Sequence, residues 1–172
     1  NLLIMKKILI LSPHTDDVEL GCGGTLARLS ELGASIHVIN FSRAKNHDDD
    51  DGELAAEEFK SSMGVLGATY EMLELPTRRL QEYRQDILEH LYNLRSEYEL
   101  ILCHSSYDQH QDHQVVQQEA FRAFKHKTIL GYELPWNCMQ FSTDFFVKLE
   151  QRHINKKNEM LNCYKSQSHR DY

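Results

Sequence analysis

The sequence predicts an α/β protein: a single domain with a mainly parallel sheet flanked by helices. Short apolar runs alternate along the chain with longer segments whose apolar residues recur at helical spacing, which is typical of βαβ units. The length of 172 residues suits one compact domain, and no linker-like stretch divides it. We therefore expect one domain over residues 1–172.

Five apolar runs are expected to form the strands of this sheet. The first predicted strand contains Ile8–Leu11 without a polar interruption, as a strand buried on both faces does. Helical segments between successive runs favour parallel pairing. In chain order the predicted strands are Lys7–Leu11, Ser35–Phe41, Thr69–Leu73, Leu100–Cys103 and Ile129–Glu133.

Apolar residues at helical spacing, such as Ile87, Leu91 and Leu94, predict the helices, each of which would pack its stripe onto the sheet. Gly33 and Gly67 stand after the first two segments, where a left-handed residue commonly ends a helix. The predicted helices are Gly24–Leu32, Glu53–Leu66, Leu80–Tyr98 and His113–Phe124, followed by Glu150–Cys163, which closes the fold.

Composition excludes several classes of function. The 19 Lys and Arg against 26 Asp and Glu give a net charge of −7, which disfavours nucleic acid and anionic membrane as partners. The acidic run Asp48–Asp51 is expected to be a solvated loop.

The Gly21–Thr25 stretch fails the dinucleotide-binding fingerprint, because Leu26 stands where its third glycine is required. The four cysteines form no C-x-x-C pair and are expected to be reduced structural thiols.

The apolar stretch near the start of the sequence is too short for a signal peptide, and nothing approaches a transmembrane span. A cytoplasmic protein without membrane insertion is therefore predicted. The last residues, Ser168–Tyr172, carry no stop signal, which is compatible with a natural chain that is cut short here.

Two polar clusters predict a catalytic metal site. Pro13–Glu19 follows the apolar run Ile8–Leu11, and Asp108–His113 follows Leu100–Cys103, so both begin where a buried strand ends. Active sites of open α/β sheets lie at those carboxyl ends. A single Asp or His there is usually a helix cap or a surface residue, but two dense clusters at strand ends favour a shared site.

A catalytic zinc needs three protein ligands and an open position for water. His14, Asp17 and His113 can supply them, with Fe²⁺ as the alternative metal. Asp16 is then the candidate general base, and His110 could stabilise an oxyanion or protonate a leaving amine.

Asp112 is better placed to hydrogen-bond a neighbouring histidine than to bind the metal. His104, directly after a strand, is equally compatible with core packing and with participation in the site.

These motifs resemble those of the LmbE-like, or PIG-L, family of zinc-dependent N-acetylglucosaminyl deacetylases. The similarity rests on Pro13–Glu19 with Gly21–Thr25 and on His110–His113, and it extends from the first strand through Glu133. It implies a Rossmann-like fold and hydrolysis of an acetamido group on a sugar or sugar conjugate. It also implies the following roles: zinc ligands His14, Asp17 and His113, general base Asp16, and His110, oriented by Asp112, to stabilise the tetrahedral intermediate.

The substrate contacts are less determined by the pattern. Where the family often has an arginine before the helix glutamate matching Glu58, this chain has Ala55 and Ala56, and Arg43, Arg78 or Arg79 could compensate. Tyr107, Trp136 and Asn137 stand at strand ends and could line a sugar pocket, since aromatic faces and amides suit a pyranose.

Two other functions stay open from the residues alone. Two His and one carboxylate also form the facial triad of non-haem iron(II) oxygenases, although an adjacent carboxylate such as Asp16 suits hydrolysis better. The second is a non-catalytic sugar-binding domain that keeps the metal as a structural element. The expected partner is a small N-acetylated sugar or conjugate, and the resemblance adds a homo-oligomer, because the family commonly assembles.

Overall fold

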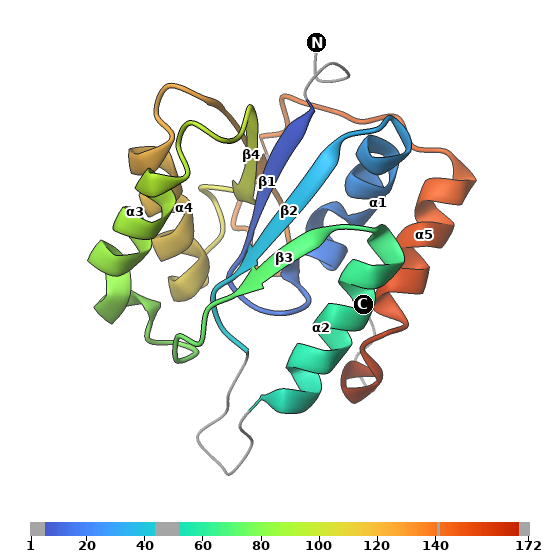
Figure 1. The fold of residues 1–172 in the computed structure, drawn as a ribbon, viewed down its shortest axis with the longest axis horizontal. Coiled ribbons are helices and arrows are strands. Elements are labelled where there is room, and N and C mark those ends of the chain that lie inside the picture. The colour runs from blue at the N-terminus through green and yellow to red at the C-terminus, as the bar shows by residue number, and fades with distance from the viewer. Residues whose placement is uncertain (1–5, 44–51, 141, 169–172) are drawn as a thin grey trace.

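Five parallel strands form one sheet in the order β3-β2-β1-β4-β5, which confirms the predicted fold class (Figure 1). The computed structural model describes residues 6–43, 52–140 and 142–168, so the acidic run Asp48–Asp51 and the last four residues lie outside the described part. The strands are β1 Lys7–Ser12, β2 Ser35–Asn40, β3 Thr69–Met72, β4 Leu100–His104 and β5 Thr128–Tyr132.

Helices cover both faces of this sheet (Figure 1). One face packs against α1, α2 and α5 through residues such as Val18, Phe59 and Met160. The other packs against α3 and α4 through Ile87, Leu91 and Val116. The helices are α1 Asp17–Glu31, α2 Glu53–Leu66, α3 Arg84–Asn93, α4 Gln111–Ala123 and α5 Gln151–Leu161, with short 3₁₀ turns η2 Leu80–Tyr83 and η3 Lys165–Gln167.

Two helix predictions were wrong in their bounds. The first helix begins at Asp17 instead of Gly24, so it contains glycines that locally disfavour a helix. These glycines are required by packing, since a Cβ on Gly21 would lie 2.3 Å from the Tyr132 ring. The third prediction, Leu80–Tyr98, is split into η2 and α3, and the chain leaves the helix after Asn93 through tighter turns towards β4. The left-handed glycines were predicted correctly, with φ of 85° at Gly33 and 74° at Gly67.

The topology brings the two polar clusters together. β1 lies in the middle of the sheet, with β2 on one side and β4 on the other. The chain passes outward from β1 to β3 and then returns to the opposite side of β1, which makes the carboxyl ends of β1 and β4 the switch point where ligands bind in such sheets. The turns after Ser12 and His104 therefore face each other.

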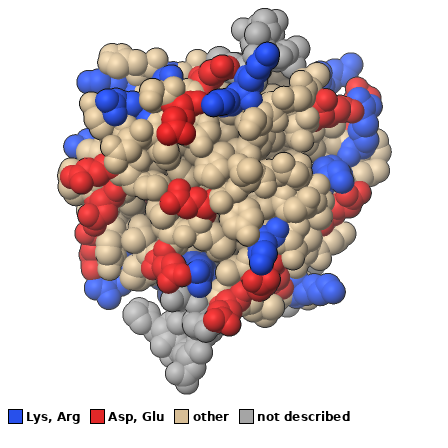
Figure 2. Space-filling model, in the orientation of Figure 1, with Lys and Arg blue, Asp and Glu red and all other residues tan. Residues whose placement is uncertain are grey.

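Basic and acidic side chains are interspersed over the face of the molecule shown in Figure 2, with no continuous basic area. Among the described residues, no helix is long and apolar enough to cross a membrane.

Candidate functional site

A tight turn between β1 and α1 presents His14 and Asp17 on the same side. The Ser12 hydroxyl donates to the His14 carbonyl oxygen at 2.5 Å, and the His14 backbone N–H donates to Asp17 Oδ2 at 2.9 Å. Asp16 occupies the N-cap position of α1, but its side chain makes no capping hydrogen bond. Instead, Asp16 lines the neighbouring pocket.

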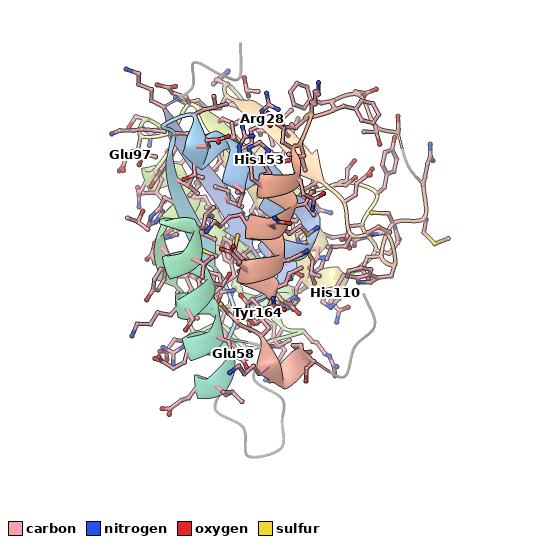
Figure 3. The ribbon with its side chains drawn as sticks, turned by 90° about the vertical axis from the view of Figure 1, so that its right-hand side faces the viewer. Arg28, Glu58, Glu97, His110, His153 and Tyr164 are labelled. Carbon is pink, nitrogen blue, oxygen red and sulfur yellow. The ribbon has the colours of Figure 1, made fainter. Side chains whose placement is uncertain are left out.

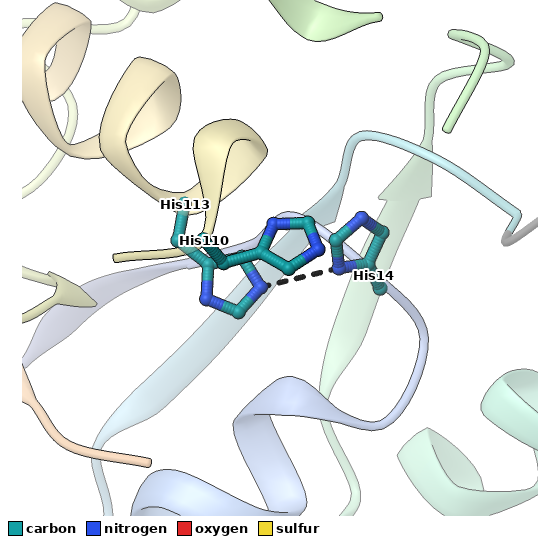
Figure 4. A group of neighbouring side chains, drawn as sticks. All are labelled: His14, His110 and His113. Atoms are coloured by element: carbon teal, nitrogen blue, oxygen red, sulfur yellow. Dashed lines mark hydrogen bonds between the residues drawn. The ribbon is translucent and has the colours of Figure 1, made fainter. Parts of the chain in front are cut away.

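Three donor atoms converge between this turn and the start of α4. His14 Nδ1 lies 3.2 Å from His113 Nε2, as the dashed line in Figure 4 shows, and both lie 3.3 Å from Asp17 Oδ2. Ligands bound about 2.0–2.1 Å from a tetrahedral zinc ion lie about 3.3–3.4 Å apart. The predicted set of two imidazoles and one carboxylate therefore fits such an ion.

The outer nitrogen of each of these imidazoles faces a buried carboxylate. His14 Nε2 lies 3.0 Å from Asp112 Oδ2, and His113 Nδ1 lies 2.9 Å from Asp108 Oδ2. Carboxylates placed in this way fix the tautomer and orientation of metal-binding histidines. Asp112 thus pairs with His14, whereas the resemblance had paired it with His110, whose Nδ1 instead accepts the Asp112 backbone N–H at 3.2 Å.

Asp108 was not singled out from the sequence, although it opens the second polar cluster. It is fully buried, and its Oδ2 also lies 3.1 Å from His104 Nδ1, while its Oδ1 accepts the His110 backbone N–H at 2.8 Å. One carboxylate therefore organises three histidine residues of the site.

His104 belongs to the site and is only 1% exposed. Its ring stacks on His113 with centroids 3.7 Å apart. Its Nε2 lies 3.4 Å from Asp17 Oδ2 and has no hydrogen-bond partner within the described part of the chain. Asp17, His104 and His113 form a second set of donors close enough for a cation, as do His14, His110 and His113.

The electrostatics of the cluster favour a cation. Burial alone would lower the pKa of His14, but Asp112 and Asp17 outweigh it and raise that pKa to about 10. In the same way Asp17 and Asp108 raise the pKa of His113 to about 9 despite its burial. Burial, together with His113 and His14, lowers the pKa of His110 to about 4. The two inner imidazoles thus sit in a field that attracts positive charge, while His110 stays neutral.

A pocket of about 440 Å³ opens in front of these donors. Of the residues predicted to contact substrate, Arg78, Trp136 and Asn137 line it, together with Asp16 and His110. The other two predicted contacts lie elsewhere. The Arg43 guanidinium pairs with Glu74, and Tyr107 lines a separate cavity of about 640 Å³.

The turn after α5 forms one wall of the pocket through Ser166 and Gln167, which the sequence analysis did not identify. Glu58 in α2 holds it by accepting the backbone N–H of Ser166 at 2.8 Å and its hydroxyl at 2.5 Å. The Tyr164 hydroxyl contacts the Thr15 carbonyl oxygen and lies 2.8 Å from Glu19 Oε1. Figure 3 shows Tyr164 at the end of α5, between Glu58 and His110.

Known proteins resemble this chain over most of its length. A family model described as PIG-L, GlcNAc-PI de-N-acetylase, matches residues 9–124. A curated relative, the uncharacterized deacetylase YaiS of Escherichia coli strain K12, is 29% identical over 171 residues, which cover 94% of this chain and 91% of that protein.

Solved structures share the fold. The conserved protein TT1542 of Thermus thermophilus is 26% identical with a TM-score of 0.78, over 93% of this chain and 79% of that one. The N,N′-diacetylchitobiose deacetylase of Pyrococcus horikoshii is 18% identical with a TM-score of 0.75, over 95% and 71% of the two chains. GalB, a 4-carboxy-2-hydroxymuconate hydratase of Pseudomonas putida, is 21% identical with a TM-score of 0.76, over 96% and 81%. The last two likenesses show the fold alone.

Proposed function

The chain belongs to the PIG-L family of de-N-acetylases, and from this membership we propose that it is a zinc-dependent hydrolase that removes the acetyl group from an N-acetylglucosamine-type sugar or sugar conjugate. The family match and the deacetylase relative support deacetylation of an N-acetylated sugar-type substrate as its activity. The zinc ion, the residue roles and the N-acetylglucosamine specificity are the proposed part.

The observation that carries the proposal is the cluster of His14, Asp17 and His113, here called the donor trio, which lies beside a pocket lined by Asp16. His14 Nδ1, Asp17 Oδ2 and His113 Nε2 lie 3.2–3.3 Å from one another, close to the separation of about 3.3–3.4 Å expected around a tetrahedral zinc ion. These three residues would hold the ion and would leave a position for water, and the adjoining pocket is lined by Asp16 and His110.

Bound zinc would act as a Lewis acid towards the amide carbonyl and would lower the pKa of the attacking water. Asp16 is the proposed acceptor of the proton that this water loses, because it lines the same pocket as His14, Asp17 and His113. Asp108 and Asp112 hold the ligand imidazoles in orientation by accepting their outer N–H groups.

His110 is the proposed hydrogen-bond donor to the developing oxyanion. Its Nδ1 accepts the Asp112 backbone N–H, so the hydrogen of the neutral ring lies on Nε2. Its pKa of about 4, lowered by burial and the neighbouring histidines, keeps the ring neutral near pH 7. A neutral ring with one fixed N–H can stabilise negative charge without first losing a proton. Asp16 passes the proton it took from water to the departing nitrogen, so that the C–N bond breaks and the products are acetate and a free amino sugar.

The test measures acetate release from a panel of N-acetylglucosamine compounds by the zinc-loaded protein. Asp16→Asn is expected to retain zinc and to lose about 10²–10⁴-fold in turnover, the usual contribution of a general base. Asp86→Asn, on the exposed side of α3, is the matched control and should keep the activity of the parent chain. Full activity in Asp16→Asn at equal metal content would refute the mechanism.

The metal and the two rival functions are separated in the same experiment. Activity of the zinc form above that of an anaerobic Fe²⁺ form supports zinc, and the reverse supports iron. Tight metal binding without acetate release from any compound would favour a sugar-binding domain over a hydrolase.

A further inference from the structure

Arg78 has a backbone conformation that residues with a Cβ rarely adopt. Its φ is 65°, and it is the one non-glycine residue of the described part with a positive φ. Glycine takes this conformation without steric cost, whereas the Cβ of an L residue crowds the backbone. Strain of this kind persists where surrounding contacts impose it, and it is concentrated at ligand-binding sites.

The contact that imposes the conformation is the carboxylate of Asp112. Its Oδ2 accepts the Arg78 backbone N–H at 2.6 Å, and its Oδ1 accepts the Leu80 N–H at 3.2 Å. The same Oδ2 lies 3.0 Å from His14 Nε2. One buried side chain therefore contacts both a predicted metal ligand and the backbone of Arg78, a residue of the pocket lining.

The neighbouring arginines are neutralised by carboxylates, and Arg78 is not. Arg43 pairs with Glu74, and Arg79 binds Glu82 through two hydrogen bonds of 2.8 and 2.7 Å. The Arg78 guanidinium has no hydrogen bond or ion pair with the described residues, and its side chain is exposed.

Among the described residues that line the pocket, Arg78 is also the single lysine or arginine. The acidic groups of the lining are Asp16 and Asp17, whose two charges a divalent ion at the donor trio would offset. Asp108 and Asp112 face the outer nitrogens of His113 and His14. The Arg78 guanidinium pairs with no carboxylate of the described residues, so it is available to a ligand in the pocket.

We propose that Arg78 binds an anionic group of the substrate, so that the preferred substrate is an acetylated amino sugar carrying a phosphate or a carboxylate. A guanidinium offers two parallel N–H donors to either oxyanion. The inference rests on the proposed deacetylase function and names the substrate class of the same site.

The experiment compares kcat/KM for N-acetylglucosamine, its 1-phosphate, its 6-phosphate and N-acetylmuramic acid. At least one acidic sugar is expected to exceed the neutral sugar by about tenfold or more, the factor expected of one charge-assisted contact. The phosphate and carboxylate arms identify which anion the site takes. Equal efficiency for the neutral sugar and every acidic sugar would overturn the proposal.

Variants separate recognition from folding. Arg78→Gly should lose the preference mainly through a higher KM, and it should melt no lower than the parent, because glycine accepts the positive φ. Arg78→Lys should keep part of the preference, since it retains the charge without the paired donors. Arg79→Ala is the matched control and should keep the whole preference. An unchanged preference in Arg78→Gly would overturn the inference.

Calorimetry with glucosamine, glucosamine 6-phosphate, glucosamine 1-phosphate and muramic acid gives a readout that needs no turnover. If no sugar is deacetylated but a glucosamine phosphate or muramic acid binds the parent chain and not Arg78→Gly, the anion site is supported and the proposed reaction fails. If glucosamine, which carries no acidic group, binds as tightly as the phosphorylated sugars and muramic acid, the anion site fails whatever the activity.

Discussion

Replacing Asp108 by asparagine should weaken metal binding although Asp108 is not expected to touch the metal. The carboxylate is fully buried, and its Oδ2 faces the Nδ1 atoms of His113 at 2.9 Å and His104 at 3.1 Å. Asparagine has nearly the same shape, but it lacks the charge and carries an NH₂ group in place of one oxygen. It can therefore accept from fewer of these donors, and His113 loses its anionic partner.

The size of the effect follows from that lost contact. A hydrogen bond to a charged group contributes about 1.5–3 kcal/mol. Converted to an equilibrium constant, this is about a 10- to 100-fold change, which agrees with the usual effect of removing an outer carboxylate from a metal site. We expect the dissociation constant for zinc to rise by about 10- to 100-fold in Asp108→Asn.

Competition with a chromogenic chelator at fixed pH measures this constant. Asp86→Asn, which removes an exposed carboxylate of α3, controls for the change in net charge. Circular dichroism establishes that both variants are folded before the titration. A zinc affinity of Asp108→Asn within about threefold of the parent chain would refute the reasoning, because the His113–Asp108 contact would then contribute nothing to metal binding.

Three further predictions concern stability. Removing metal with a chelator should lower the Tm by about 5–10 °C relative to protein in zinc at 100 times its dissociation constant, as differential scanning calorimetry would show. Burial raises the pKa of Glu19 from 4.5 to about 7, so the folded state keeps a proton that the unfolded chain releases above pH 4.5, and stability falls until about pH 7. The free energy of unfolding of the metal-free parent should therefore fall by about 3 kcal/mol more than that of Glu19→Gln as the pH rises from 4 to 8, as urea denaturation would show. An equal pH dependence of the two proteins would contradict this. Gly21→Ala should destabilise by about 1–3 kcal/mol because its Cβ meets the Tyr132 ring, whereas Gly64→Ala, with open space, should stabilise by about 0.5–1 kcal/mol in the same assay.

The strands and the positions of both polar clusters could be predicted because a strand buried on both faces is a continuous apolar run in the sequence. Ile8–Leu11 and Leu100–Cys103 are apolar without interruption, and parallel pairing then places the residues that follow them at one edge. The beginning of α1 could not be predicted in this way. Glycines at Gly21, Gly23 and Gly24 disfavour a helix locally, and only the packing of distant side chains explains them.

The outer carboxylates and the arginines show the same limit. That Asp112 pairs with His14 depends on a contact across 98 positions, which no local spacing reveals. The sequence gives no reason to prefer Arg43 or Arg78 as the substrate contact. The structure separates them, because Glu74 pairs with Arg43. A role that depends on which partner already holds a charge requires the tertiary structure.

The hydrogen bond from the Tyr164 hydroxyl to the Thr15 carbonyl oxygen joins residues 149 positions apart. On a ribosome the loop that carries His14 is made well before the Tyr164 hydroxyl that braces it, because 149 positions separate Thr15 from Tyr164. The nascent protein can therefore build its sheet well before the His14 loop is braced, since domains collapse before their last contacts form. Conversely, detachment of α5 from the finished protein would release the same loop, so protease cleavage in α5 should inactivate the molecule while most of its strands remain paired.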